Sequence, residues 1–395
     1  MPHPLAQAIE MVTTALALAG MGYFLASLLA ARSFLRERRA QQPLFSPGVS
    51  ILKSLKGLDP GMMDAFRSHC RQKYAGDFEL LFGVSSLSDP AAAAVQQLVA
   101  EFPELSIRLL ECSERLGTNG KVSTLAQLAP HARYDFWLIN DSDITVGPHY
   151  LERVMCCFAP ATHDAGKAPV GLVTALYRGR AHGTIASRLE ALGIATDFIP
   201  SVLLSKLIER GLHYGLGSTL AVQRKALEKA GGLLALVDQL ADDYEMGVRV
   251  ARVGYRVSLS AEVVETSVPA YAWGGFVDHQ LRWLRTVRDA RPAGYVGLVF
   301  THGLAWAVLN VLASGLSPVS LWLLGLSFFL RLTQAMSVGA EVLGDHEVLA
   351  NLWLLPLRDA VAMGLWVAGF AGDTIVWRGE RFALKNGKLV KAERS

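Results

Sequence analysis

The amino-acid sequence predicts an α/β fold in which a mostly parallel sheet is flanked by transmembrane helices. Between about residues 48 and 270, short runs rich in β-branched and aromatic residues alternate with helical stretches, which is the pattern of parallel strands joined by crossover helices. The apolar residues that raise the mean hydropathy to +0.30 gather in blocks at the two ends of the chain. We therefore expect a globular domain between membrane segments.

Composition and charge exclude several classes of protein. With 51% hydrophobic and only 18% charged residues among 395, the chain is not a disordered protein, and a purely soluble enzyme is disfavoured. The formal net charge is only +3, so no global positive field indicates a nucleic-acid partner. The cysteines lack C-x-x-C spacing and are expected to be reduced thiols in a packed domain. They are Cys70, Cys112, Cys156 and Cys157.

A first membrane helix is expected near the N-terminus. Residues 11–31 carry no charge, and as a helix they would be about 31 Å long, close to the hydrocarbon thickness of a bilayer. Basic residues follow this run and do not precede it, which favours an uncleaved anchor over a signal peptide and a cytoplasmic location for the chain beyond it. We assign residues 1–40 to this anchor and its basic flank, which contains Arg32, Arg36, Arg38 and Arg39.

Residues 293–372 are expected to hold further membrane helices. The tail that follows, residues 373–395, is basic and is expected on the cytoplasmic side. Three full crossings would put it on the other side, so one apolar stretch is expected to be re-entrant or interfacial, and the last, which Arg358 and Asp359 interrupt, is a candidate. The three apolar stretches cover residues 293–313, 318–330 and 349–370.

Residues 44–292 are expected to form the cytoplasmic globular domain, ending in a basic juxtamembrane helix. Ligands of parallel sheets bind at the carboxyl ends of the strands, so the residues that follow each strand are the candidate site residues. Strands are predicted over residues 49–52, 78–84, 106–110 and 134–140, and helices over 62–73, 91–101 and 123–128.

Asp141 and Asp143 directly follow the apolar strand 134–140. Two carboxylates two residues apart at this edge are costly without a cation, and Mg²⁺ or Mn²⁺ bridging to a diphosphate would neutralise them. The alternative is a turn that caps the strand end.

Two further polar segments precede that strand. Asp89 lies before Pro90 and an alanine-rich helix, so a helix cap is a strong alternative to a ligand-binding role. The loop from Gly117 to Lys121 ends in a lysine that can meet a phosphate, or that is solvated in a turn.

Paired acids and a row of arginines follow later in the chain. Asp242 and Asp243 lie at the start of a predicted helix. The helix dipole accounts for one of these acids, and the other could act as a general base toward an acceptor hydroxyl. Arg282 heads a row of arginines that recur every three residues just before the membrane. The row indicates either a stripe on anionic lipid or, for Arg282, a guanidinium that holds a departing diphosphate. Its members are Arg282, Arg285, Arg288 and Arg291.

In this order, over about residues 44–292, these motifs resemble the membrane-bound ceramide glucosyltransferase family, which includes related bacterial hopanoid glycosyltransferases and has an A-type nucleotide-diphospho-sugar transferase domain. The segment 52–57, Leu-Lys-Ser-Leu-Lys-Gly, matches with Ser54 where proline is usual. The closing motif keeps Arg282 and Trp283 but departs from the family's Gln or Arg at His279.

The resemblance implies a role for each matching residue. Asp141 and Asp143 would hold Mg²⁺ or Mn²⁺, Asp243 would be the base, and Arg282 with Trp283 would complete the catalytic set. The residues that would bind substrate are Lys53, Asp89, Gly117, Asn119, Lys121, Asp141, Gly217, Asp242 and His279.

The activity implied is inverting, metal-dependent transfer from a UDP-sugar to a membrane lipid hydroxyl on the cytoplasmic side, in the inner membrane of a bacterium. UDP-glucose with ceramide is the first expectation, and UDP-N-acetylglucosamine with a hopanoid is the alternative. A processive polysaccharide synthase is disfavoured by the small number of apolar segments. A non-catalytic membrane scaffold is disfavoured because Asp89, Asp141, Asp143 and Asp243 are all present.

Overall fold

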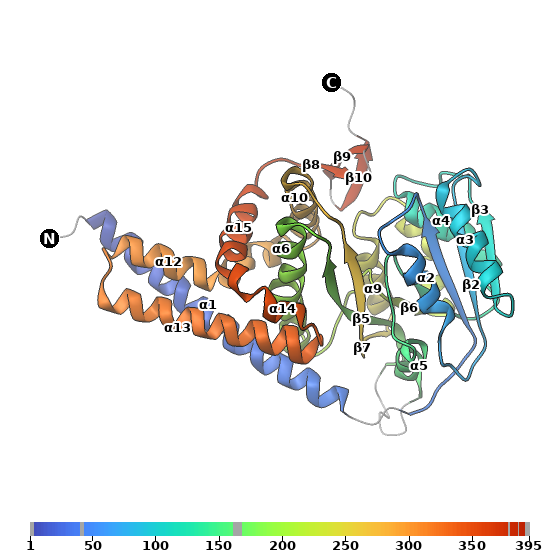
Figure 1. Cartoon of the computed structure of the whole chain (residues 1–395), viewed down its shortest axis with the longest axis horizontal. Coiled ribbons are helices and arrows are strands. Elements are labelled where there is room, and N and C mark those ends of the chain that lie inside the picture. The colour runs from blue at the N-terminus through green and yellow to red at the C-terminus, as the bar shows by residue number, and fades with distance from the viewer. Residues whose placement is uncertain (1–3, 40–42, 161–167, 378–379, 386, 392–395) are drawn as a thin grey trace.

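The computed structural model describes residues 4–39, 43–160, 168–377, 380–385 and 387–391. Figure 1 shows an elongated molecule in which long helices occupy one end and the central β-sheet with its covering helices occupies the other. Between them lie α6 (Ile185–Gly193), α10 (Trp273–Ala290) and α15 (Leu355–Ala368). The predicted α/β fold with flanking apolar helices is confirmed.

The central sheet has seven strands in the order β3-β2-β1-β4-β6-β5-β7. β1 pairs in parallel with β2 and β4, β2 with β3, and β5 with β7, whereas β6 is antiparallel to both of its neighbours. A single reversed strand leaves the carboxyl ends of β1, β2, β3 and β4 at one edge. The strands are β1 (Val49–Leu55), β2 (Phe78–Val84), β3 (Ser106–Glu111), β4 (Phe136–Ile139), β5 (Val170–Ala181), β6 (Leu220–Gln223) and β7 (Arg256–Val268).

The first half of the domain follows the predicted alternation closely. The helix predicted from residue 123 begins earlier, because the Asn119 side chain accepts a hydrogen bond from Val122 N and caps the first turn. β4 is shorter than residues 134–140, since Asn140 already turns into the loop that carries the two aspartates. The helices here are α2 (Met62–Cys70), α3 (Pro90–Glu101), α4 (Gly120–Leu128), α5 (Tyr150–Met155), α8 (Arg224–Lys229) and α9 (Asp242–Arg252).

Within the described residues, three helical segments are long and apolar enough to cross a membrane, or four if a bent pair counts as one span. The first segment is α1 (Pro4–Arg38), and another runs from α13 (Pro318–Met336) into a π-helical turn that ends at Val342. The bent pair is formed by 292–301 and α12 (Gly303–Ala313), which meet at 58°. The first arm of this pair begins with α11 (Pro292–Gly297), and a further short helix of this region is α14 (Glu347–Ala350).

The first of the three C-terminal stretches is bent by 58°, as in a broken span or a re-entrant segment. The stretch that carries Arg358 and Asp359 forms α15, whose 14 residues fall short of a span. Both charged side chains are buried there in contact with protein groups.

Small and polar residues join the apolar helices. α1 crosses α12 where Gly20 lies against Gly303, so close that a side chain on either would overlap with the other's backbone. Asn310 on α12 donates to the Thr13 and Thr14 hydroxyls on α1, at 3.1 and 2.7 Å. Close backbone approach and interhelical hydrogen bonds of this kind associate helices where no hydrophobic driving force acts between them.

One apolar helical segment lies inside the stretch predicted to be a cytoplasmic domain. Residues 185–208 form α6, a π-helical turn and α7 (Ile199–Ile208), and they pass the same test of length and hydropathy as α1. α7 packs on α1, and the Tyr23 and Ser201 hydroxyls lie 2.9 Å apart. The segment thus joins the sheet domain to the apolar helices.

The C-terminal tail carries a small sheet and also engages the arginine row. Arg285 donates to the carbonyls of Thr374 and Ala371, at 2.6 and 2.9 Å, and Arg288 donates to Gly369 O at 2.7 Å just beyond α15. Most of the row is therefore bound to protein groups and does not form a free stripe for anionic lipid. The strands of this sheet are β8 (Thr374–Trp377), β9 (Glu380–Lys385) and β10 (Lys388–Lys391).

Candidate active site

A cavity of about 1540 Å³ opens along the carboxyl ends of the parallel strands. Ser54 lies in the last two residues of β1, Ser85 follows β2, Ser113 follows β3 and Asp141 follows β4, and all four line the cavity. This is the edge at which the sequence predicted ligand binding. The opposite wall comes from β7, α9 and α10, and the cavity continues between the apolar helices.

Asp141 and Asp143 lie on the cavity wall beyond β4. The Asp141 side chain is 46% exposed, whereas Asp143 Oδ2 accepts hydrogen bonds from Thr266 Oγ1 at 2.6 Å and Ser267 N at 3.1 Å, both at the end of β7. Burial and the neighbouring charge of Asp141 raise the pKa of Asp143 above its ordinary value. A cation between the two carboxylates would relieve both effects.

Two lysines supply positive charge beside these acids. Lys121 Nζ lies 2.7 Å from Asp141 Oδ1 and 3.7 Å from Asp242 Oδ2. Burial alone would lower the pKa of Lys121, but the two carboxylates outweigh it and hold the pKa above its usual range. Lys53 is fully buried behind the wall, where Nζ donates to Asp141 O at 3.1 Å, and burial lowers its pKa to about 7.

Asp243 is placed by the close packing of α9 against the glycine-rich loop before β6. A side chain at Gly247 would overlap with the backbone of Tyr214 and Gly215, so only glycine lets the loop lie on this helix. A Cβ added at Gly217 would lie 3.0 Å from Asp243 Oδ2 and 3.6 Å from Asp141 Oδ2. The two carboxylates therefore face one another across Gly217.

The pKa of Asp243 is raised toward the range that suits a general base. Loss of hydration and the charge of Asp242 raise its pKa to about 6, even though Lys121 and the 2.8 Å hydrogen bond from Tyr244 N act in the opposite direction. A base whose pKa lies near the working pH transfers protons efficiently.

The α10 motif lies across the cavity from the sheet. His279 Nδ1 lies 3.0 Å from Glu190 Oε2 on α6, and the imidazole stacks on Tyr271 with ring centroids 5.5 Å apart. Arg282 and Trp283 also line the cavity. His279 is thus engaged with a buried carboxylate in the position where the resembling family has Gln or Arg.

Four residues expected to bind substrate are not among those that line the cavity. Lys53 supports the Asp141 backbone, and Asp89 caps α3 while accepting from Gly57 N at 2.9 Å. Gly117 packs tightly on Val237, and the Asn119 amide donates to Gln239 O at 2.8 Å. These residues contact other groups of the protein, so we infer that they position the loops that form the cavity wall.

The structure adds site residues that the motifs did not indicate. Glu190, an acid within an apolar helical run, holds His279 and Gln280. Thr266 on β7 holds Asp143. Glu190 had a signal in the sequence, as a charge in an otherwise apolar helix, whereas Thr266 had none because its role depends on strand pairing.

The chain is similar to known glycosyltransferases in sequence and in structure. The sequence profile of glycosyl transferase family 21 matches residues 12–390. The chain belongs to this family. Among curated relatives, ceramide glucosyltransferase 3 of Caenorhabditis elegans is 23% identical over 369 residues, which cover 87% of this chain and 74% of that protein. A ceramide glucosyltransferase of Komagataella phaffii is 30% identical over 126 residues, which cover 31% of this chain and 25% of that protein.

A solved structure shows the same fold. The mannosyltransferase PcManGT from Pyrobaculum calidifontis, in complex with GDP-Man and Mn²⁺, superposes with a TM-score of 0.56 at 19% sequence identity, over 92% of this chain and 97% of that chain. The family 21 protein is therefore a glycosyltransferase with a mostly parallel sheet of the A type, and it uses a nucleotide-sugar donor.

The residues at the edge of β4 fit a divalent cation that also binds substrate. In the described part of the chain, no group of three or more His, Cys, Asp or Glu side chains is arranged as a metal site. Mg²⁺ is commonly held by one or two carboxylates together with substrate phosphates and water. Asp141 and Asp143 supply such a pair at the end of β4, and both line the cavity.

Proposed function

We propose that this family 21 enzyme transfers glucose from UDP-glucose to the primary hydroxyl of a ceramide-type membrane lipid, with inversion at the anomeric carbon. The observation that carries the proposal is the single cavity, which runs from the carboxyl ends of the strands to residues of the apolar helices such as Leu298, Leu365 and Trp366. A donor and a lipid can therefore meet in one space. The relatives' printed activity supports ceramide as acceptor.

The chemistry follows from the placement of the carboxylates. Asp243 takes the proton of the acceptor hydroxyl as the hydroxyl oxygen bonds to the anomeric carbon. The bond from that carbon to the diphosphate breaks on the opposite face. A divalent cation held by Asp141 and Asp143 would neutralise charge on the departing UDP. Arg282, on the α10 side of the same cavity, suits phosphate oxygens as a guanidinium.

The arrangement of the basic residues supports a cytoplasmic site. Arg38, at the end of α1, donates to Val342 O at 3.0 Å, and Glu37 pairs with Lys206 on α7. These contacts join the basic end of α1 to α7 and to the turn after α13, and Figure 1 shows this end of α1 beside the sheet domain. By the positive-inside rule the domain then lies on the cytoplasmic face.

Removal of the divalent cation tests the role of the aspartate pair. Chelation with EDTA should abolish transfer, and Mn²⁺ or Mg²⁺ should restore it. Asp143→Ala should weaken Mn²⁺ binding in the presence of UDP by about 10- to 100-fold or more, measured by calorimetry, because it removes half of the protein ligands. Asp135→Ala removes an exposed aspartate before the same strand and should bind Mn²⁺ as the wild type does. Full activity in EDTA would contradict the proposal.

The substrates are tested by assay in nanodiscs. UDP-glucose and UDP-N-acetylglucosamine are each offered with ceramide or with a bacteriohopane polyol, and the lipid product is identified by mass spectrometry. Glucosylceramide with an inverted linkage is expected. Formation of an N-acetylglucosaminyl hopanoid would be consistent with the mechanism but would show that both the donor and the acceptor differ from those proposed. No turnover with any pair would overturn transfer to either of these lipids.

A further inference from the structure

The lipid end of the cavity holds an unpartnered polar group. His302 is 8% exposed and lines the cavity at the start of α12, directly after the 58° bend. Within the described part of the chain, His302 Nε2 has no hydrogen-bond partner. Of the buried side-chain atoms in this condition, it is the one whose residue lines the cavity; the others belong to Arg108, Gln223, Arg285, Ser327 and Gln334.

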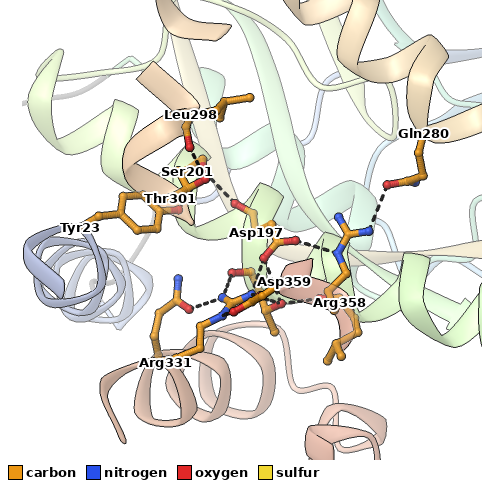
Figure 2. Close-up of polar contacts among 12 residues, drawn as sticks. Tyr23, Asp197, Ser201, Gln280, Leu298, Thr301, Arg331, Arg358 and Asp359 are labelled. Carbon is orange, nitrogen blue, oxygen red and sulfur yellow. Dashed lines mark hydrogen bonds and ion pairs between the residues drawn. The ribbon is translucent and has the colours of Figure 1, made fainter. Parts of the chain in front are cut away.

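The other polar groups at this end are taken up by the protein. Figure 2 shows Asp197 between Arg331 and Arg358, and the distances are 2.5 and 2.8 Å. The Ser201 hydroxyl donates to Asp197 O at 2.8 Å, and the Thr301 hydroxyl donates to Leu298 O at 2.8 Å. Among the described residues that line this end of the cavity, His302 is the one with a buried side-chain nitrogen that has no partner.

Burial without a partner is costly for an imidazole nitrogen. Leaving such a group unsatisfied costs free energy, and a ligand that hydrogen-bonds it would recover this cost. The surrounding side chains of Leu365 and Trp366 are apolar, and the Trp366 ring lies 5.5 Å from the imidazole. A ligand that reaches His302 would therefore meet an apolar ring beside one unpaired polar nitrogen.

We propose that His302 hydrogen-bonds a second polar group of the acceptor lipid, an amide or hydroxyl separate from the hydroxyl that reacts at Asp243. The inference rests on the proposed function, since it names a subsite for that lipid. An imidazole serves either kind of group, because its ring nitrogen donates in one tautomer and accepts in the other. His302 then selects lipids with such a second group over simple long-chain alcohols.

The test compares two acceptors in nanodiscs: N-hexanoylsphingosine, which has an amide and a second hydroxyl, and hexadecanol, used as substrate or as competing inhibitor. His302→Leu should lower kcat/KM for N-hexanoylsphingosine about tenfold, the effect of one buried hydrogen bond, and leave the hexadecanol constant unchanged. His302→Gln should retain most of the activity. Ser327→Ala, which removes a buried hydroxyl from α13 outside the cavity, is the matched control.

The outcomes separate this inference from the proposed function. UDP-glucose hydrolysis without acceptor reports a folded donor site and should be equal in all variants. Equal losses with both acceptors, or none with N-hexanoylsphingosine, would overturn the role of His302 while leaving lipid transfer intact. Absence of transfer to N-hexanoylsphingosine by the wild type would overturn the proposed acceptor, and this subsite with it.

Discussion

Asp243→Asn is expected to lower kcat for sugar transfer by about 10²- to 10⁴-fold, the usual contribution of a general base. The amide is nearly isosteric with the carboxylate but cannot take the proton of the acceptor hydroxyl. Binding of the nucleotide sugar should persist, because Asp141, Asp143 and Lys121 are unchanged. The measurement is single-turnover transfer to lipid together with calorimetric binding of the UDP-sugar.

Glu245→Gln is the matched control for this variant. Glu245 lies in the same first turn of α9 and pairs with Arg249 at 3.3 Å, outside the residues that line the cavity. It should keep wild-type kcat. Comparable losses in the two variants would indicate disruption of the helix start, and undiminished transfer by Asp243→Asn would exclude Asp243 as the base.

The raised pKa of Asp243 also predicts a pH dependence. The base is active when deprotonated, so kcat/KM should fall about tenfold per unit as the pH drops below about 6. Between the ordinary value of 3.8 and about 6, the folded state holds a proton that the unfolded state releases, so this carboxyl lowers stability as the pH rises through that window. Asp243→Asn should therefore be more stable than the wild type at pH 7.

Arg331→Met is expected to destabilise the protein by about 3 to 5 kcal/mol, because it leaves a buried carboxylate without its partner. Arg331 on α13 is 2% exposed and reaches two carboxylates: Asp359 Oδ1 at 2.6 Å and Asp197 Oδ1 at 2.5 Å. Figure 2 shows how the guanidinium joins α13, α15 and the turn after α6. Denaturation followed by tryptophan fluorescence in detergent measures the loss.

A double variant distinguishes an unpaired charge from lost packing. In Arg331→Met/Asp359→Leu both charges are gone and Asp197 keeps its 2.8 Å pair with Arg358, so much of the stability should return. Arg188→Met removes an exposed arginine from α6 and should change the free energy of unfolding by less than about 0.5 kcal/mol. A loss in the double variant equal to the sum of the single losses would contradict the ion-pair explanation.

The sequence predicted the candidate catalytic and metal-binding residues because their signals are local. The apolar strand followed by Asp141 and Asp143 is a pattern of a few consecutive residues, and so is the helix start at Asp242 and Asp243. Strand order then brought these segments to one edge, since parallel strands in such sheets expose their carboxyl ends together. The family resemblance could be seen for the same reason, in short motifs in a fixed order.

Only the tertiary structure decided which of those residues face the cavity and which residues line its end between the apolar helices. Lys53 and Asn119 lie on the protein side of the wall, which no periodicity predicts. Arg331 meets Asp197 across 134 residues of chain, and His302 enters the cavity through a bend between two helices. Contacts between distant segments depend on how helices cross, and helix crossings are set by packing of whole faces, which a local sequence pattern does not record.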